Sequence, residues 1–190
     1  MANSDKPNGF RPVKHLNGSP WNGQFNRYYG AANLFMGDLV IHEAAGQAIG
    51  DGAYPGCDRA AADGILIGVV VGWEPDPAAL DRTYYATSNS LAVFIMDDPN
   101  VILEAQANDA GLAAADVGLN CDFVVAAGNT TTGLSNMEID GGTEATTIDE
   151  PLKLVGAVNR PDNDLATANS RWLVLINQHR LKQEAGTTGI

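Results

Sequence analysis

The chain has 190 residues, of which 45% are hydrophobic and 18% charged, and it carries a formal net charge of −12. That acidity argues against nucleic acid as a partner, because duplex affinity depends on Lys and Arg side chains that neutralise phosphates. The sequence lacks the run of about 18 apolar residues that a membrane helix needs, and Lys and Pro interrupt the N-terminus where a signal peptide would be apolar. We therefore expect one soluble domain without membrane association.

Residues 1–23 are expected to form an extended N-terminal arm. Pro7, Pro12 and Pro20 fix the backbone and remove amide donors, and three Asn-Gly pairs are typical of turns. A disordered tail has little use for large apolar side chains, yet this segment contains several, together with basic ones. We predict that the arm contacts a partner through Phe10, Arg11, Val13, Lys14, Leu16 and Trp21, and the alternative is that it packs on its own domain.

Charge is unevenly distributed along the chain. Residues 1–30 hold four basic side chains and one acid, whereas residues 31–150 hold two basic side chains and nineteen acids. A basic arm on an acidic body can dock on a complementary surface, while the like charge of the bodies keeps unassembled copies apart. An ordinary solvated acidic surface explains the body equally well.

From residue 24 onwards, short apolar segments alternate with turn signals. Their β-branched and aromatic content predicts strands near residues 24–29, 37–42, 65–73, 83–87, 91–96, 101–106, 122–126, 137–139, 152–159 and 171–177. Helix is indicated only as one or two turns near 77–81 and 110–115. The predicted fold is therefore all-β, a barrel or sandwich of short strands with little helix over residues 24–180, followed by a C-terminal tail at 181–190.

Residues 65–73 are apolar at consecutive positions, and they do not alternate with polar ones. This pattern predicts a strand that is buried on both faces and lies between two layers. Gly68 and Gly72 would let the strand bend sharply, as barrels require. Trp73 and Trp172 fall within apolar strand patterns and are expected in the core.

The sequence offers little for catalysis, and we expect no enzyme activity, cofactor or metal. It has no Gly-x-Ser-x-Gly elbow for a nucleophile and no Gly-rich phosphate loop. The three histidines lie far apart in the sequence, and the acids at 74–76 and 97–98 are typical of turns next to Pro. Cys57 and Cys121 lack metal-ligand and CxxC spacing, so we expect two buried free thiols.

Several motifs resemble, in the same order, those of small virion structural proteins of tailed phages, in particular marine and cyanobacterial ones. They span nearly the whole chain, at residues 8–20 (NGFRPVKHLNGSP), 68–76 (GVVVGWEPD), 97–99 (DDP), 131–134 (TTGL) and 159–163 (NRPDN). The resemblance implies a head-decoration, or cement, protein that is β-rich and commonly a homotrimer. It also implies binding to the major capsid protein on the outer surface of the virion, with an extended arm reaching over neighbours.

We therefore expect a capsid decoration protein that stabilises contacts between neighbouring capsid subunits. Two other functions stay open. A tail-tube or head-tail connector protein would form rings, and a carbohydrate-binding barrel for host attachment would present exposed aromatic side chains.

Overall fold

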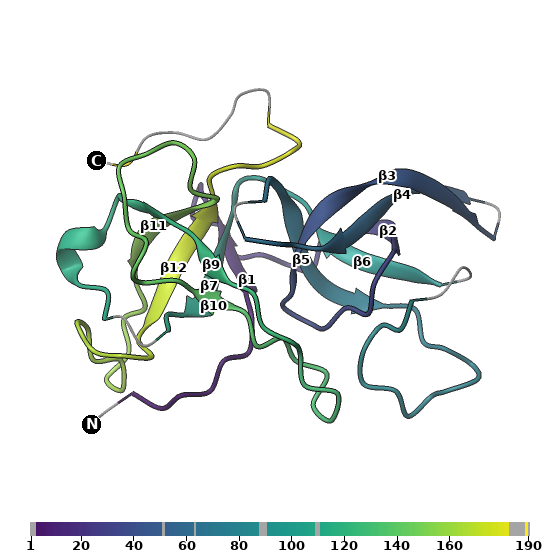
Figure 1. Ribbon diagram of the computed structural model, residues 1–190, viewed down its shortest axis with the longest axis horizontal. Helices are drawn as coiled ribbons and strands as arrows, with labels where there is room; N and C mark the ends of the chain where they lie inside the picture. The colour runs from purple at the N-terminus through teal and green to yellow at the C-terminus, as the bar shows by residue number, and fades with distance from the viewer. Residues whose placement is uncertain are drawn as a thin grey trace.

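The computed structural model describes residues 3–50, 52–62, 64–87, 91–108, 111–182 and 189 (Figure 1). The described residues form twelve strands: β1 (Arg11–His15), β2 (Asn26–Gly30), β3 (Leu39–Ile49), β4 (Gly52–Arg59), β5 (Leu66–Trp73), β6 (Ala92–Met96), β7 (Val101–Gln106), β8 (Asn120–Cys121), β9 (Phe123–Val124), β10 (Glu138–Ile139), β11 (Leu152–Ala157) and β12 (Arg171–Ile176). They also form one 3₁₀ turn, η1 (Ala114–Asp116). The predicted all-β fold is confirmed.

Five strands close into a barrel in the order β2-β4-β3-β5-β6, on the right of Figure 1. Neighbouring strands run antiparallel except β2 and β4, which are parallel with Tyr29 opposite Gly56. The long β3–β4 hairpin extends past the rest of the barrel (Figure 1). Closure pairs the barrel strands with one another and so removes free edges that would otherwise recruit another chain.

Most of the other strands form an antiparallel sheet in the order β1-β7-β12-β11-β8, and β9 and β10 pair beside it on the left of Figure 1. β1 is one edge of this five-stranded sheet and β8 is the other. Because β1 pairs with β7, with Arg11 opposite Glu104, residues 11–15 belong to the sheet of the body. This corrects the expectation that residues 1–23 are irregular throughout. Pro12 is tolerated because β1 is an edge strand.

Strand β5 is buried on both faces, as its sequence predicts. Leu66 and Val69 pack in the cluster shared with β7 and β12 of the five-stranded sheet. Ile67 and Val70 pack in the cluster formed inside the barrel. The change of face occurs at Gly68, whose φ of +154° and close approach to the backbone of β6 leave no room for a side chain.

Three strands escape prediction, namely β1, β4 and β8. β4 contains Gly52, Pro55 and Gly56, which are residue types that propensity excludes from strands. One strand was predicted where none forms. The prediction at 83–87 is wrong, because Tyr85 forms only an isolated bridge with Leu34.

Neither predicted helical segment forms an α-helix in the described residues. Residues 77–81 contain only turns, and the segment at 110–115, of which residue 110 lies outside the described residues, contributes only the start of η1. Most of the tail predicted at 181–190 also lies outside the described residues.

The two tryptophans expected in the core differ in burial. Trp172 is fully buried, as predicted, and Trp73 is partly buried against the barrel core.

Candidate partner-binding surface

The N-terminal segment folds back on itself as a hairpin. After β1, Gly18 turns the chain with a φ of +90°, and its amide donates to the carbonyl of His15 at 2.9 Å. The returning residues then pair with β1. The His15 amide donates to the Ser19 carbonyl at 2.8 Å, and the Trp21 amide donates to the Val13 carbonyl at 3.1 Å. We call residues 11–21 the N-terminal hairpin.

Phe10 fixes the base of this hairpin. Its side chain is 1% exposed and lies in the core cluster shared with β7 and β12, and its amide donates to the Gly37 carbonyl at 2.9 Å. Gly9, with a φ of +69°, passes so close to Gly37 that a Cβ would clash with the backbone there. Phe10 is therefore buried in its own chain and not available to a partner, which corrects the prediction. Pairing of β1 with β7 turns this ring inward, where burial stabilises it most.

Trp21 is held in a similar way but less completely. Its ring is half-buried against the same core cluster, and its Nε1–H donates to the Gln24 carbonyl at 3.3 Å. Only part of the indole remains at the surface, so Trp21 can border a contact but not insert deeply into a partner.

The other predicted contact residues lie at the surface of the N-terminal hairpin. Val13 and Leu16 are 39% and 57% exposed, Arg11 is exposed and Lys14 is half-buried. The pairing of β1 with β7 shifts at Val13, which is the extra residue of a bulge. One short hairpin thus presents two apolar and two basic side chains.

An open groove lies beside the tip of the N-terminal hairpin, lined by His15, Leu16, Asn17, Asp98 and Asn100. The Leu16 amide donates to the Asn100 carbonyl at 2.7 Å, and His15 Nδ1 lies 3.3 Å from Asp98 Oδ2. These contacts tie the tip to the turn between β6 and β7. The exposed Leu16 side chain is therefore displayed by a supported loop and not by a free end.

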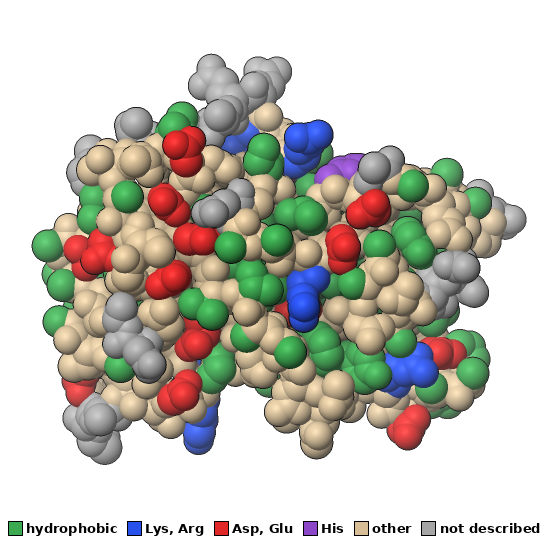
Figure 2. Space-filling view, in the orientation of Figure 1, with side chains coloured by type: hydrophobic (Ala, Val, Ile, Leu, Met, Phe, Trp, Pro, Cys, Tyr) green, Lys and Arg blue, Asp and Glu red, His purple; other side chains and the backbone are tan. Residues whose placement is uncertain are grey.

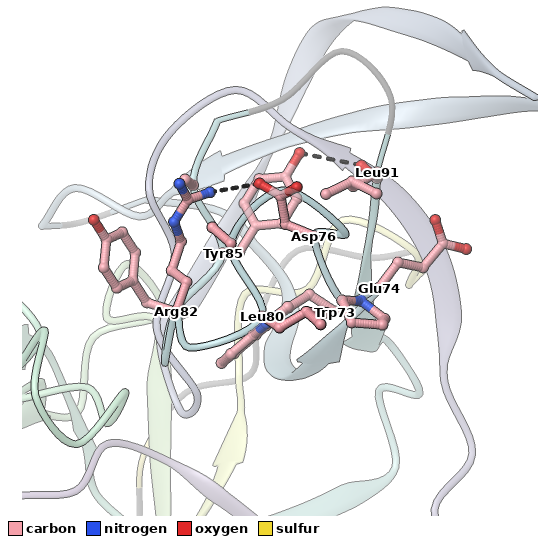
Figure 3. Close-up of a pocket in the computed structure, with 11 residues that line it drawn as sticks. Trp73, Glu74, Asp76, Leu80, Arg82, Tyr85 and Leu91 are labelled. Atoms are coloured by element: carbon pink, nitrogen blue, oxygen red, sulfur yellow. Dashed lines mark hydrogen bonds and ion pairs between the residues drawn. The ribbon is translucent and has the colours of Figure 1, made fainter.

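A second hollow lies on the barrel, where Trp73 and Tyr85 line a pocket of about 60 Å³ (Figure 3). That volume holds about two water molecules. Its ionic groups are all paired: Arg82 Nη1 lies 2.9 Å from Asp76 Oδ2, and Glu74 pairs with Arg27 beside the pocket. The Tyr85 hydroxyl donates to the Leu91 carbonyl at 3.2 Å, also drawn in Figure 3. The contacts brace a loop, and we assign this pocket a structural role.

The histidines and cysteines are dispersed. Within the described ranges, no three His, Cys, Asp or Glu side chains gather as a metal site would require. Cys57 and Cys121 are buried, unpaired and in different core clusters, which confirms the two free thiols expected from the sequence. Burial raises the pKa of the Cys57 thiol to about 12, so it stays protonated at neutral pH.

One surface was not predicted from the sequence. It is the face of the five-stranded sheet that points away from the core, and we call it the outer sheet face. Along β12, Trp172, Val174 and Ile176 are buried, while the residues between them are only half-buried and point the other way. Arg171 lies in that outward set, and Lys153 takes the corresponding place on β11. The sequence of β12 carries no signal for this face, because residues 172–176 are apolar at consecutive positions.

Comparison of the chain with protein-family models, with curated protein sequences and with solved structures found no match. In the part of the chain that the structure describes, no helix is long and apolar enough to cross a membrane. Of the surfaces described above, the N-terminal hairpin is the one that displays exposed apolar side chains on a supported loop. We take it as the candidate partner-binding surface.

Proposed function

We propose that the chain is a non-enzymatic structural protein of a tailed-phage virion. Its role would be that of a head-decoration protein, which binds the outer surface of the capsid and stabilises contacts between neighbouring major capsid subunits. The motifs at residues 8–20 and 68–76, which resemble those of virion structural proteins, support the phage assignment. The observation that carries the binding role is the exposure of Val13 and Leu16 on a hairpin that the body holds in place.

The proposed contact is pre-organised. A free arm loses conformational entropy when it docks, whereas the N-terminal hairpin is already fixed by Phe10 at its base and by the Leu16–Asn100 hydrogen bond at its tip. Burial of its apolar side chains then contributes about 25 cal/mol per Å² with little ordering cost. Arg11 and Lys14 lie on either side of Val13 in the sequence and favour an acidic rim on the partner.

Several copies would act together on a capsid. A homotrimer, which the resemblance implies, would bring three hairpins to one junction between capsid subunits. Once one hairpin is bound, the others meet their sites at a high effective concentration, so weak single contacts become a strong attachment. Such bridging would resist the outward stress that packaged DNA places on the junctions.

The direct test of this proposal is binding of the purified protein to mature heads of the phage that encodes it. Co-sedimentation should show saturable binding with a fixed ratio of protein to capsid subunits. Binding to isolated tails in preference to heads would contradict the decoration role and favour a tail-tube or connector protein. Binding to glycans with no binding to heads would favour host attachment.

A further inference from the structure

The outer sheet face has a defined composition, which the strand register gives. Residues directly opposite each other on neighbouring strands point to the same side of a sheet. Lys14 lies opposite Ile102, Ile102 opposite Leu175, and Leu175 opposite Lys153. One row across four strands therefore reads basic, apolar, apolar, basic, in which Ile102 is buried and Leu175 is half-buried.

The next row of the outer sheet face has the same character. Arg11 lies opposite Glu104, and Glu104 lies opposite Leu173. Arg160 Nη2 lies 3.1 Å from Glu104 Oε1, and Arg171 Nη1 lies 3.9 Å from the same oxygen, so one carboxylate faces two guanidinium groups. The half-buried leucines of β12 thus lie between groups of cations.

More than half of the basic side chains of this chain gather on or around this face. The chain has eleven Lys and Arg in total. Six of them are Arg11, Lys14, Lys153, Arg160, Arg171 and Lys182. Four carboxylates lie among them: Glu104 and Asp162, and also Asp5 and Glu138, which accept from the side chain of Gln106 opposite Arg171. Lys182 lies at the end of β12, where its ammonium group donates to the Ile176 carbonyl at 2.8 Å. Burial lowers the pKa of Lys182, and the charge of Lys153 lowers it further. In a chain of net charge −12, the outer sheet face is a basic surface.

The opposite charge gathers at the far edge of the same sheet. The segment 116–150 contains seven carboxylates and no Lys or Arg. Glu138 is bound to Gln106 of β7 and lies away from this edge. The other six are Asp116, Asp122, Asp140, Glu144, Asp149 and Glu150. Residues 143–145 lie beside β8, since Asn120 bridges Ala145 and the Asp122 amide donates to Thr143 Oγ1 at 2.9 Å. Burial raises the pKa of Cys121 in β8, and the charges of Glu150, Asp122 and Glu144 raise it further. Figure 2 shows acidic side chains spread over the half of the molecule that holds β11 and β12. We call these loops around β8 the acidic flank.

We infer that the outer sheet face of one copy of this chain docks on the acidic flank of a second copy. The two surfaces are different, so the contact is head-to-tail and each bound copy keeps one surface open for the next. If the rotation between copies closes, this contact gives a small closed assembly such as the trimer of the proposed function, and otherwise it gives an open chain. The second copy is the occupant because the matching charge is carried by the same chain, while the half-buried leucines supply an apolar centre.

Net charge and local charge act at different distances. Two copies of charge −12 repel each other at long range, but screening limits that repulsion to about 8 Å at physiological ionic strength. At contact, the basic and acidic surfaces dominate. Reversal of local charges should therefore alter association more than a moderate change in salt does.

Charge reversal on each surface tests the inference, with sedimentation velocity of the free protein as the measurement. The face variant is Lys14→Glu with Lys153→Glu, and the flank variant is Glu144→Lys with Asp149→Lys. Wild-type protein should associate as its concentration rises. Each variant should associate about 100-fold more weakly, because like charges replace opposite ones at the contact. Circular dichroism and thermal unfolding check that both variants fold, and the milder changes Lys14→Gln and Lys153→Gln replace the first pair if they do not.

Mixing the two variants makes the test specific. The face variant keeps its acidic flank and the flank variant keeps its basic face, and their two reversed surfaces also match each other. An equimolar mixture should therefore associate, whereas each variant alone should stay largely monomeric. A chain that carries all four substitutions should associate again. A monomeric wild-type protein at every concentration, or a mixture that stays monomeric, would overturn the inference. No capsid is used, so failure here is distinct from failure of the proposed decoration role.

Discussion

The backbone amide of Phe10 donates to the carbonyl of Gly37 at 2.9 Å, and this bond joins the N-terminal segment to the loop that precedes β3. The Phe10 ring then fills the core shared by the barrel and the five-stranded sheet. One residue thus connects both halves of the molecule to the base of the N-terminal hairpin. The display of the hairpin and the stability of the fold depend on the same contact.

Replacement of Phe10 by Ala should reduce the free energy of unfolding by about 3–5 kcal/mol, because the ring is fully buried and would leave a cavity. Chemical denaturation followed by fluorescence measures the change. Phe25→Ala is the matched control, since that ring is 46% exposed and stacks on Phe94 at the surface, and it should cost about 1 kcal/mol. Equal effects of the two substitutions would show that Phe10 does not occupy the core.

Gly68→Ala should destabilise the protein by about 2–4 kcal/mol. The φ of +154° disfavours any side chain, and an added Cβ would strike the Met96 carbonyl. Gly156→Ala in β11 is the control, because nothing lies within 4 Å of a Cβ built there, and its effect should stay within about 0.5 kcal/mol. Comparable midpoints for both variants in a urea titration would argue against the β5 bend described above.

Stability should fall on acidification through His179. Burial lowers its pKa from the ordinary 6.5 to about 4 in the folded chain. Between these values the unfolded chain binds a proton and the folded chain does not, so unfolding becomes easier as pH decreases from about 6.5 to about 4. The loss attributable to His179 approaches about 3 kcal/mol at the lower end.

His179→Asn isolates this contribution. The Asn side-chain oxygen can accept the Leu181 amide, as His179 Nδ1 does at 3.1 Å, but it does not titrate. The free energy of unfolding of the variant should depend less steeply on pH between 4 and 6.5 than that of the wild type. Parallel pH profiles for the two proteins would show that His179 is not held neutral by burial.

Leu16→Asp should weaken binding to heads by about tenfold or more and leave stability within about 0.5 kcal/mol of the wild type, because the side chain is 57% exposed. Leu80→Asp is the matched control, at 78% exposure on the barrel loop of Figure 3. It should bind as the wild type does. Equal loss in both variants would mean that general surface charge, and not the N-terminal hairpin, governs attachment.

Local sequence signals predicted the strands that have strong apolar patterns. Val101–Gln106 is predicted with the bounds that it has as β7, and β5 is recognised as a strand with two buried faces because it is apolar at consecutive positions. β4 escapes prediction because Pro55 and its glycines disfavour strands, and only pairing with β3 and β2 overrides them.

Only part of the candidate surface was predicted, because local sequence patterns do not show which distant segments pair. Large apolar residues in a Pro-rich segment indicate that the segment docks on something, but they do not show whether the docking surface is in the same chain. The pairing of β1 with β7, which is distant in sequence, decides that Phe10 turns inward and Leu16 outward. Local propensity contains no information about such long-range pairing. The outer sheet face stayed hidden because its cations come from β1, β11, β12 and the loops around them.

The central claim is that the fixed N-terminal hairpin attaches this protein to a capsid, and electron cryo-microscopy of mature heads saturated with the purified protein tests it most directly. The account predicts density for the β-body on the outer surface at junctions between capsid subunits, with Val13 and Leu16 buried against the capsid. Density confined to the tail or neck, or a bound body whose hairpin points to solvent, would contradict it.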